Sequence, residues 1–540
     1  MKKYKGNIVD VTNNKIYPGV VVVNHGRIHK ISETEEEYDN YITPGFVDAH
    51  IHIESTMLTP SEFARIAVQH GTVAAICDPH EIANVLGVEG VEYMIENSRK
   101  SPLKFYFSAP SCVPATDLET SGAKLGPNQI AGLFQEYPEV KFLGEMMNYK
   151  GVIEFDPEVM RKIGIANEYN KPIDGHAPGL KGDDLEKYVG VGVTTDHECT
   201  TREDALHKLK LGMIILIREG SAAKNFDELI PLAKEHYQHM AFCTDDKHPD
   251  DLIGDHINEL VKRAIKSGID PLKIFRMACL NPVRHYNLEV GLLRKNDAAD
   301  FLILDNLEDL NIQSTIIDGN TIYEDGVSVI QSITPRKVNN FTTGPKYPED
   351  FFVAAKSGMI DVIVAKDGQL LTSRMEVEPK INNKKIIPDI TNDILKIALI
   401  NRYEDQEPAV AFIKNFGLEK GAIASSVAHD SHNILAVGVA DQDICEAVNL
   451  IIENEGGLCA YCSEENIKVI LPLPIAGLIS DKDYQVVAEE YKNIDKVAKQ
   501  LGSRLRAPFM TLSFMSLLVI PEIKLGNQGL FDVTNFKYIE

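Results

Sequence analysis

The chain has 540 residues, enough for about three or four domains at roughly 150 residues each. Its formal net charge is −24. Because a negative field of that size repels phosphate groups, we expect neither nucleic acid nor an anionic membrane surface as a partner. The longest uncharged runs, 469–480 and 507–521, contain proline and are shorter than the ~18 residues that a membrane-spanning helix needs.

The first 282 residues contain two kinds of sequence pattern. Segments rich in β-branched residues predict short strands at 7–11, 19–23 and 27–31, with an acidic loop at 33–39. From residue 44 onward, apolar strand-like segments alternate with helical ones such as 61–69 and 202–209. The predicted strands lie at 46–48, 72–77, 105–108, 142–144, 173–175, 193–196, 213–217 and 241–243. Eight strands separated by helices predict an α/β fold, a TIM-type (β/α)8 barrel.

The remainder of the chain predicts two further regions. Strands at 300–305, 315–318 and 320–323 are expected to join the first strands in one small β-domain built from both flanks of the barrel. Beyond it we expect a C-terminal α/β or α+β domain, with a helix at 392–400 and strands at 409–412 and 435–438. The predicted domains are 1–43 with 286–345 (small β-domain), 44–285 (barrel) and 346–540 (C-terminal domain).

The eight cysteines are scattered, apart from Cys459 and Cys462. A large intracellular chain usually keeps such cysteines as buried free thiols, and a single Cys-x-x-Cys pair is weak support for a zinc or redox site. The N-terminus has no apolar signal segment. These features together favour a cytoplasmic location.

His50 and His52 are the first candidates for chemistry. Alternation along a strand puts the two side chains on the same side, and barrel enzymes hold their chemistry at the C-terminal ends of the strands. Both imidazoles could therefore reach one metal ion. A lone His-x-His remains a weak signal, because core or exposed histidines account for it equally well.

Four further residues follow the ends of predicted strands: Glu145, His176, His197 and Asp245. Four histidines and two carboxylates at such positions indicate a dinuclear metal site, and these ligand types suit zinc, iron or manganese without distinguishing them. Two cations lower the pKa of a bridging water, and a carboxylate beside it can pass the proton to a leaving group. The alternative is that all six are structural residues of a large barrel.

Longer runs carry a family resemblance. Pro-Gly-Phe-Val-Asp-Ala-His-Ile-His at 44–52, Asp245 and the run 291–300 resemble the amidohydrolase superfamily. Within it the chain is similar to the bacterial adenine deaminases. That similarity extends over the runs 52–60, 77–87, 174–179, 196–198, 218–221, 243–246 and 428–433, and so over nearly the whole chain.

The resemblance implies hydrolysis of adenine to hypoxanthine and ammonia, a purine-salvage reaction, with two divalent metal ions. Manganese or iron is favoured, and zinc is an alternative. It implies that His50, His52, His176 and His197 are metal ligands, that Glu145 bridges the metals, and that Asp245 is both ligand and proton shuttle. Many relatives use a carboxylated lysine as the bridge, but Lys141 precedes Glu145 on the strand itself, so we favour the glutamate. A homo-oligomer, either dimer or tetramer, is expected.

The roles of other residues stay open. Attack at C6 of the purine requires a proton or a strong hydrogen bond at N1, for which Glu54, Glu198 and His80 are candidate donors. Arg218 and Ser221 are candidates for contacts with the purine edge, against an ordinary salt bridge and a helix cap. In the C-terminal domain, candidate substrate contacts, against the alternative of a surface loop, are His429, Asp430 and His432.

Three other functions compete. A cyclic amidohydrolase, such as a dihydroorotase or hydantoinase, predicts a lysine bridge, and Glu145 and the run 218–221 speak against it. A zinc base deaminase needs Pro-Cys-x-x-Cys, but Leu458 precedes Cys459. A non-enzymatic scaffold of the same fold is least favoured, because all six expected ligands are present.

Overall fold

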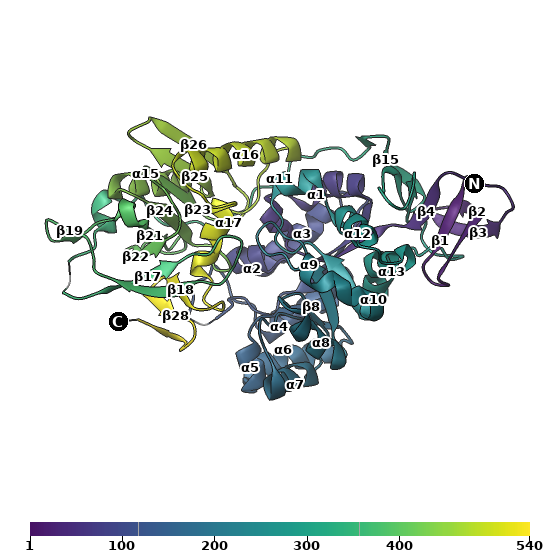
Figure 1. The fold of residues 1–540 in the computed structure, drawn as a ribbon, viewed down its shortest axis with the longest axis horizontal. Helices are drawn as coiled ribbons and strands as arrows, with labels where there is room; N and C mark the ends of the chain where they lie inside the picture. Colours follow the sequence, from purple (N-terminus) through teal and green to yellow (C-terminus); the bar gives the residue numbers. More distant parts are fainter. Residues whose placement is uncertain (117, 356, 540) are drawn as a thin grey trace.

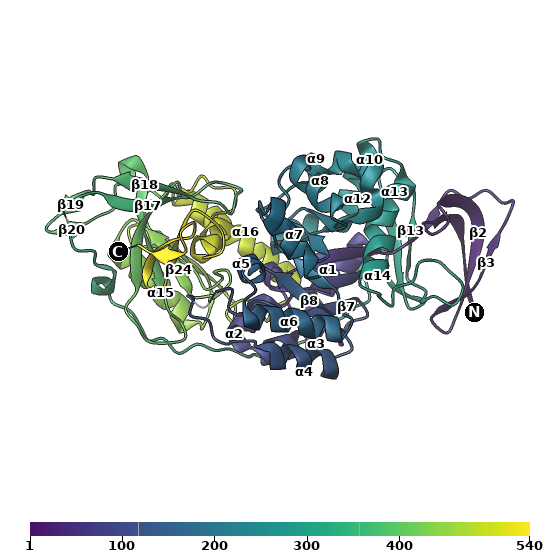
Figure 2. The same ribbon diagram turned by 90° about the horizontal axis from the view of Figure 1, so that it is seen from below.

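The structure, a computed structural model, describes residues 1–116, 118–355 and 357–539. Three regions follow one another along the longest axis of the molecule (Figures 1 and 2). Strands from the N-terminus lie at one end, a barrel with its helices lies in the middle, and the C-terminal region forms the other end. Within the described residues, no helix combines the length and apolarity needed to cross a membrane.

The small sheet at the N-terminal end combines two distant parts of the chain, as predicted. Its strand order is β16-β15-β14-β13-β4-β1-β2-β3, and β13 pairs antiparallel with β4. Val21, Val23 and Phe301 contribute to the core of this sheet. The strands are β1 (Lys2–Asp10), β2 (Lys15–Asn24), β3 (Arg27–Glu33), β4 (Tyr41–Pro44), β13 (Phe301–Leu304), β14 (Ile312–Ile317), β15 (Asn320–Glu324) and β16 (Val327–Ser328).

Eight parallel strands form the barrel in the middle. Hydrogen bonds link β5 to β9 in one sheet and β10 to β12 in another, and single parallel bridges join the two sheets at both seams, Ile173 with Val193 and Ile51 with Asp245. The predicted barrel is therefore confirmed. Its strands are β5 (Phe46–Ile51), β6 (Thr72–Cys77), β7 (Lys104–Ala109), β8 (Val140–Met146), β9 (Ile173–Gly175), β10 (Thr195–Asp196), β11 (Ile214–Arg218) and β12 (Met240–Cys243).

Helices cover the outside of these strands, which explains why the strand sequences are apolar on both faces. The predicted helices at 61–69 and 202–209 correspond to α1 and α8, which begin after the capping hydroxyls of Thr59 and Thr201. The helices are α1 (Pro60–Ala67), α2 (His80–Leu86), α3 (Val88–Ser98), α4 (Pro127–Glu136), α5 (Tyr149–Ile153), α6 (Pro157–Glu168), α7 (Gly182–Gly190), α8 (Arg202–Lys210), α9 (Phe226–Leu229), α10 (Ala233–His236), α11 (Pro249–Gly254), α12 (Ile257–Lys266), α13 (Pro271–Phe275) and α14 (Asn281–His285).

The C-terminal region is built on a second large sheet, in the order β18-β17-β22-β21-β24-β23-β25-β26. Helix α15 (Asp441–Glu453) packs on β23, β24 and β25, and α16 (Tyr484–Gln500) contacts both this sheet and helix α11 of the barrel. Helix α17 (Pro508–Ser513) leads to a small sheet of β27 (Ile523–Gly526), β28 (Gly529–Asp532) and β29 (Lys537–Tyr538). The remaining strands are β17 (Ile360–Val364), β18 (Ser373–Val377), β19 (Ile381–Asn382), β20 (Lys385–Ile386), β21 (Ile394–Ile400), β22 (Ala409–Lys414), β23 (Ala422–Ser425), β24 (Ile434–Gly438), β25 (Gly457–Cys462) and β26 (Ile467–Pro472).

The helix predicted at 392–400 is wrong, because this segment is strand β21 in the interior of that sheet. All seven residues of β21 are buried, and the strand pairs antiparallel with both β22 and β24. A short apolar run suits a buried helix or a buried strand, so the pairing partners decide between them. Lys396 interrupts the run, and its ammonium donates to the Phe351 carbonyl at 2.8 Å.

All eight cysteines are free and buried, as predicted. Cys459 packs in the apolar cluster that includes residues of α15, whereas Cys462 belongs to the main core cluster. The two cysteines of strand β25 therefore belong to different apolar clusters, and both are core residues.

Candidate active site

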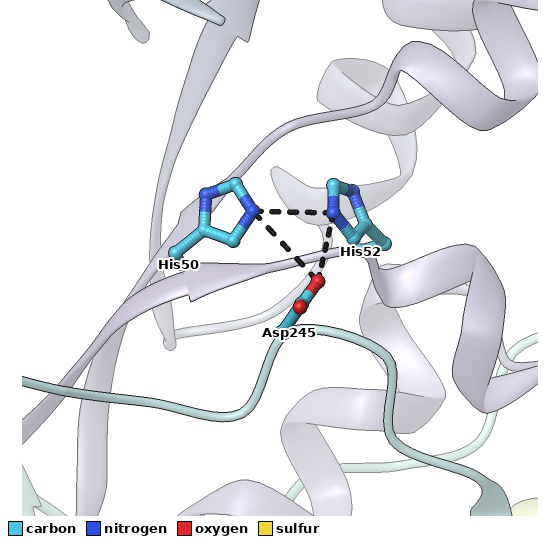
Figure 3. A group of neighbouring side chains, drawn as sticks. All are labelled: His50, His52 and Asp245. Atoms are coloured by element: carbon cyan, nitrogen blue, oxygen red, sulfur yellow. Dashed lines mark hydrogen bonds and ion pairs between the residues drawn. The ribbon is translucent and has the colours of Figure 1, made fainter. Parts of the chain in front are cut away.

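The seam where Ile51 of β5 bridges to Asp245 brings three predicted ligands together (Figure 3). His50 Nε2 lies 3.1 Å from His52 Nε2, and Asp245 Oδ1 lies 3.1 Å from His52 Nε2 and 3.9 Å from His50 Nε2. The backbone fixes this arrangement: the Asp245 N–H donates to the His50 carbonyl at 2.9 Å, and the His52 N–H donates to the Asp245 carbonyl at 3.3 Å. Strand pairing between β5 and the end of β12 thus positions all three side chains.

Glu145, at the end of β8, lies between two pairs of histidines. Its Oε1 is 3.2 Å from His52 Nε2 and 3.7 Å from His50 Nε2. Its Oε2 is 2.6 Å from His176 Nδ1 and 3.3 Å from His197 Nε2. Burial acts to raise the pKa of Glu145, but His176 and His197 outweigh it and hold the pKa well below its usual range. The carboxylate is therefore ionised and shared between two sets of imidazoles.

The chemistry of these donors fits a divalent metal site. The Asp78 carbonyl accepts a hydrogen bond from His52 Nδ1 at 2.9 Å, which fixes the tautomer and leaves a lone pair on the Nε2 that faces His50 Nε2. A nitrogen lone pair among buried carboxylate oxygens and further imidazoles is a favourable donor set for a positive ion. The six predicted ligands are each at most 7% exposed and form a single cluster: His50, His52, Glu145, His176, His197 and Asp245.

Lys141, the alternative bridge, is not part of this cluster. Its ammonium lies 5.9 Å over the ring of Tyr106. Glu145 is instead held in the cluster by a side chain, because the Glu145 N–H donates to the Asp78 carboxylate Oδ2 at 2.8 Å.

Arg218 at the end of β11 bonds to two acidic residues. Its Nη1 donates to Asp245 Oδ2 at 2.6 Å and also to Glu198 Oε1. Burial acts to lower the pKa of Arg218, but Glu198 and Asp245 hold it well above its usual value. The salt bridge considered in the sequence analysis is thus present, and it is made to a candidate metal ligand.

His80 and Glu54 lie beside the cluster on the other side. His80 Nδ1 is 3.6 Å from Glu145 Oε1, and its Nε2 faces Glu81 and Asp430 at 3.5 and 3.9 Å. Glu54 Oε1 accepts from the Ile82 N–H at 3.1 Å, whereas within the described residues Glu54 Oε2 has no hydrogen-bond partner. Burial raises the pKa of Glu54 to about 7.

Ser221 is not brought into the cluster. Its hydroxyl donates to Asp251 Oδ2 at 2.5 Å and accepts from the His248 N–H at 2.9 Å. These contacts tie the loops after β11 and β12 to each other.

The loop between β23 and β24 reaches the barrel. His429, Asp430 and His432 are buried, and both histidines bond to Glu81 at the start of α2. The surface-loop alternative for these residues is therefore wrong. Sequence reasoning missed Glu81, although it is the neighbour of His80 in one of the runs that carry the resemblance.

Comparisons with known proteins agree with this geometry. Residues 41–322 match the family described as "Amidohydrolase family", and residues 369–537 match "Adenine deaminase C-terminal domain". The chain is 52% identical to a protein of Sulfurovum sp. (strain NBC37-1) named "Adenine deaminase", over 99% of each chain. It is 49% identical to a protein of the same name from Methanosarcina mazei, covering 100% of this chain and 99% of that one.

A solved structure, a β-aspartyl dipeptidase from Fervidobacterium islandicum AW-1, covers 60% of this chain and 96% of its own, with a TM-score of 0.47 and 15% identity. The family assignment rests on the two domain matches and the full-length relatives. The chain belongs to the adenine deaminases of the amidohydrolase family.

Proposed function

We propose that the chain hydrolyses adenine to hypoxanthine and ammonia at the six-residue cluster of the barrel. The observation that carries this proposal is Glu145, which contacts His52 through one oxygen and His176 through the other, as a bridging ligand between two cations would. Relatives named adenine deaminase at 49–52% identity over the full length support adenine as the substrate.

The cluster would hold a pair of divalent cations, which would supply a water of lowered pKa near neutral pH. His50, His52 and Asp245 would hold one cation, His176 and His197 the other, and Glu145 would contact both. The family resemblance leads us to expect manganese or iron, and zinc stays an alternative because imidazole and carboxylate ligands suit all three.

Asp245 is the proposed proton shuttle. It takes a proton from the attacking water and gives it to the departing amino group, so that the C–N bond at C6 breaks and ammonia leaves. The hydroxyl proton left on C6 returns to the group that protonated N1, which gives the C6 carbonyl of hypoxanthine. Arg218 donates to Asp245 Oδ2 and Asp245 Oδ1 faces His52, so the carboxylate has a defined orientation. We therefore propose that Arg218 orients Asp245 instead of contacting the purine edge.

The proton for N1 is best supplied by His80 or Glu54. Burial acts to raise the pKa of Glu198, but Arg218 and His176 lower it, so Glu198 is an ionised acceptor. His80 lies between Glu145 and Asp430, and Glu54 has one oxygen without a partner among the described residues. Among the described residues His80 Nδ1 and Glu54 Oε2 have no hydrogen-bond partner, so each is a candidate donor to N1.

The decisive experiment uses metal-reconstituted protein with adenine, adenosine and a cyclic amide, and measures release of ammonia and opening of the amide ring. We expect ammonia from adenine. Ammonia from adenosine alone, or ring opening of the amide alone, would overturn the proposed function.

A further inference from the structure

Glu81 is a barrel residue that bonds to two histidines of the C-terminal domain. His429 Nδ1 bonds to Glu81 Oε1 and His432 Nε2 bonds to Glu81 Oε2, across 348 and 351 positions of sequence. The three side chains, here called the Glu81 clasp, are each at most 2% exposed. Both oxygens of one carboxylate thus hold the loop 428–433 against the start of α2.

The two histidines of the clasp are in different states. His432 Nδ1 accepts a hydrogen bond from the Ala428 N–H at 3.2 Å, so its proton is on Nε2 and points at Glu81. Burial lowers the pKa of His432 to about 4, which keeps that ring neutral. Burial also acts to lower the pKa of His429, but Glu81 and Asp246 raise it to about 9. The clasp therefore combines one ion pair with one neutral hydrogen bond.

The loop is firmly attached to its own domain. The ring of His429 stacks on Phe514 with centroids 4.5 Å apart and planes 8° from parallel. The His429 N–H donates to the Ser513 carbonyl at 2.9 Å, and the Tyr403 hydroxyl donates to the Ser431 carbonyl at 2.7 Å. The loop that bonds to Glu81 is thus joined to other parts of the C-terminal domain.

Asp430, between the two histidines, is the residue that the clasp presents to the barrel. Its Oδ1 lies 3.9 Å from His80 Nε2, and the other nitrogen of His80 lies 3.6 Å from Glu145 Oε1. Among the described residues Asp430 Oδ2 has no hydrogen-bond partner, although Asp430 is only 2% exposed. A buried carboxylate oxygen without a partner is costly, so it points to a ligand that supplies an N–H.

We propose that Glu81 is a positioning residue that holds the loop 428–433 over the metal centre, so that Asp430 accepts a hydrogen bond from an N–H of the bound purine. This inference rests on the proposed function for the identity of the ligand. It assigns to the C-terminal domain a direct part in substrate binding, acting through a residue of the barrel.

The test compares Glu81→Gln with Asp483→Asn. Asp483 also bonds across the two regions, accepting from Arg65 at 2.5 Å, but it does not touch the cluster, so its variant controls for loss of an inter-domain contact. In Glu81→Gln we expect KM for adenine to rise by about 10-fold to 100-fold while two metal ions per chain are retained. Asp483→Asn should keep the wild-type KM.

A double variant separates positioning from mere stability. If Glu81 acts through Asp430, the double variant Glu81→Gln/Asp430→Asn should have a KM for adenine no higher than that of Asp430→Asn alone. A KM raised by the product of the two single effects, or a lower active fraction with unchanged KM, would overturn the proposal. Should Glu81→Gln not fold, His429→Gln and His432→Gln remove the same contact from the other domain, with the same expectations.

Metal release to EDTA provides a readout that does not depend on adenine. An open loop exposes the cluster, so Glu81→Gln should lose metal about 10-fold faster than the wild type and Asp483→Asn. Equal rates of metal release in all three proteins would contradict the proposed role of the Glu81 clasp. A wild-type protein inactive on adenine would refute the proposed function, while the release rates would still test the clasp.

Discussion

The barrel and the C-terminal loop place their polar side chains in opposite ways. In the barrel, each candidate ligand comes from the end of a different strand, apart from the pair His50 and His52, and the set extends over almost 200 residues of sequence. In the C-terminal domain, three residues of one short loop, His429, Asp430 and His432, reach the same region. The first arrangement is spread along the sequence and the second is concentrated in it.

The two arrangements are also held by different forces. Backbone hydrogen bonds between β5 and the end of β12 position Asp245, so a change of its side chain leaves the frame intact. The loop contacts the barrel residue Glu81 through side chains, so one change there can release it from the barrel. Barrel variants should therefore alter chemistry or metal content, and variants of the clasp should alter substrate binding.

The largest effect is expected for Asp245→Asn. An amide cannot take up the proton, so turnover of adenine should fall by about 100-fold to 10,000-fold, measured as ammonia release at saturating adenine. The circular dichroism spectrum should stay that of the wild type. Near-normal turnover would remove Asp245 from the shuttle role.

Glu145→Gln should act on metal content first. Loss of the shared negative charge should lower the bound metal below two ions per chain, with activity falling in parallel, measured by elemental analysis after dialysis. Two fully occupied sites in this variant would point to a different bridge.

Arg218→Lys distinguishes orientation of Asp245 from contact with the purine. Lysine keeps the charge but lacks the planar fork that reaches Glu198 and Asp245 together, so kcat should fall by about 10-fold with little change in KM. A raised KM with unchanged kcat would instead show that Arg218 contacts the substrate.

The smallest effect concerns Lys524, whose ammonium donates at 2.9 Å to the carbonyl of Phe514, the residue on which His429 stacks. Burial lowers its pKa to about 7. The folded state therefore binds this proton more weakly than the unfolded state, and the free energy of unfolding should rise by roughly 2 kcal/mol between pH 7 and pH 9.

Lys524→Met should remove this part of the pH dependence, which thermal melting of both proteins at the two pH values would show. Identical pH dependence in the two proteins would mean that Lys524 does not lose its proton over this range.

The sequence predicted the barrel well because of how barrel strands are buried. Strands covered on both faces read as apolar runs, and the polar residue that ends each run, such as Glu145 or Asp245, lies on the catalytic face. The segment 394–400 has the same apolar character, and a short apolar run suits a buried helix or a buried strand, so its pairing could not be read locally. The resemblance indicated His429 and His432 but gave no partner for them, because the contact with Glu81 depends on how two domains pack.

The seam between β5 and β12 gives the metal centre a second significance. The first and last strands of the barrel meet there, and Ile51 bridges to Asp245 between two candidate ligands of the same cation. Residues 50 and 245 become neighbours only when the ring of strands closes, so the binding site does not exist in a partly formed barrel. A cation bound across this seam would stabilise the closed barrel over partly formed ones. Metal binding would therefore contribute to the free energy of folding as well as to catalysis.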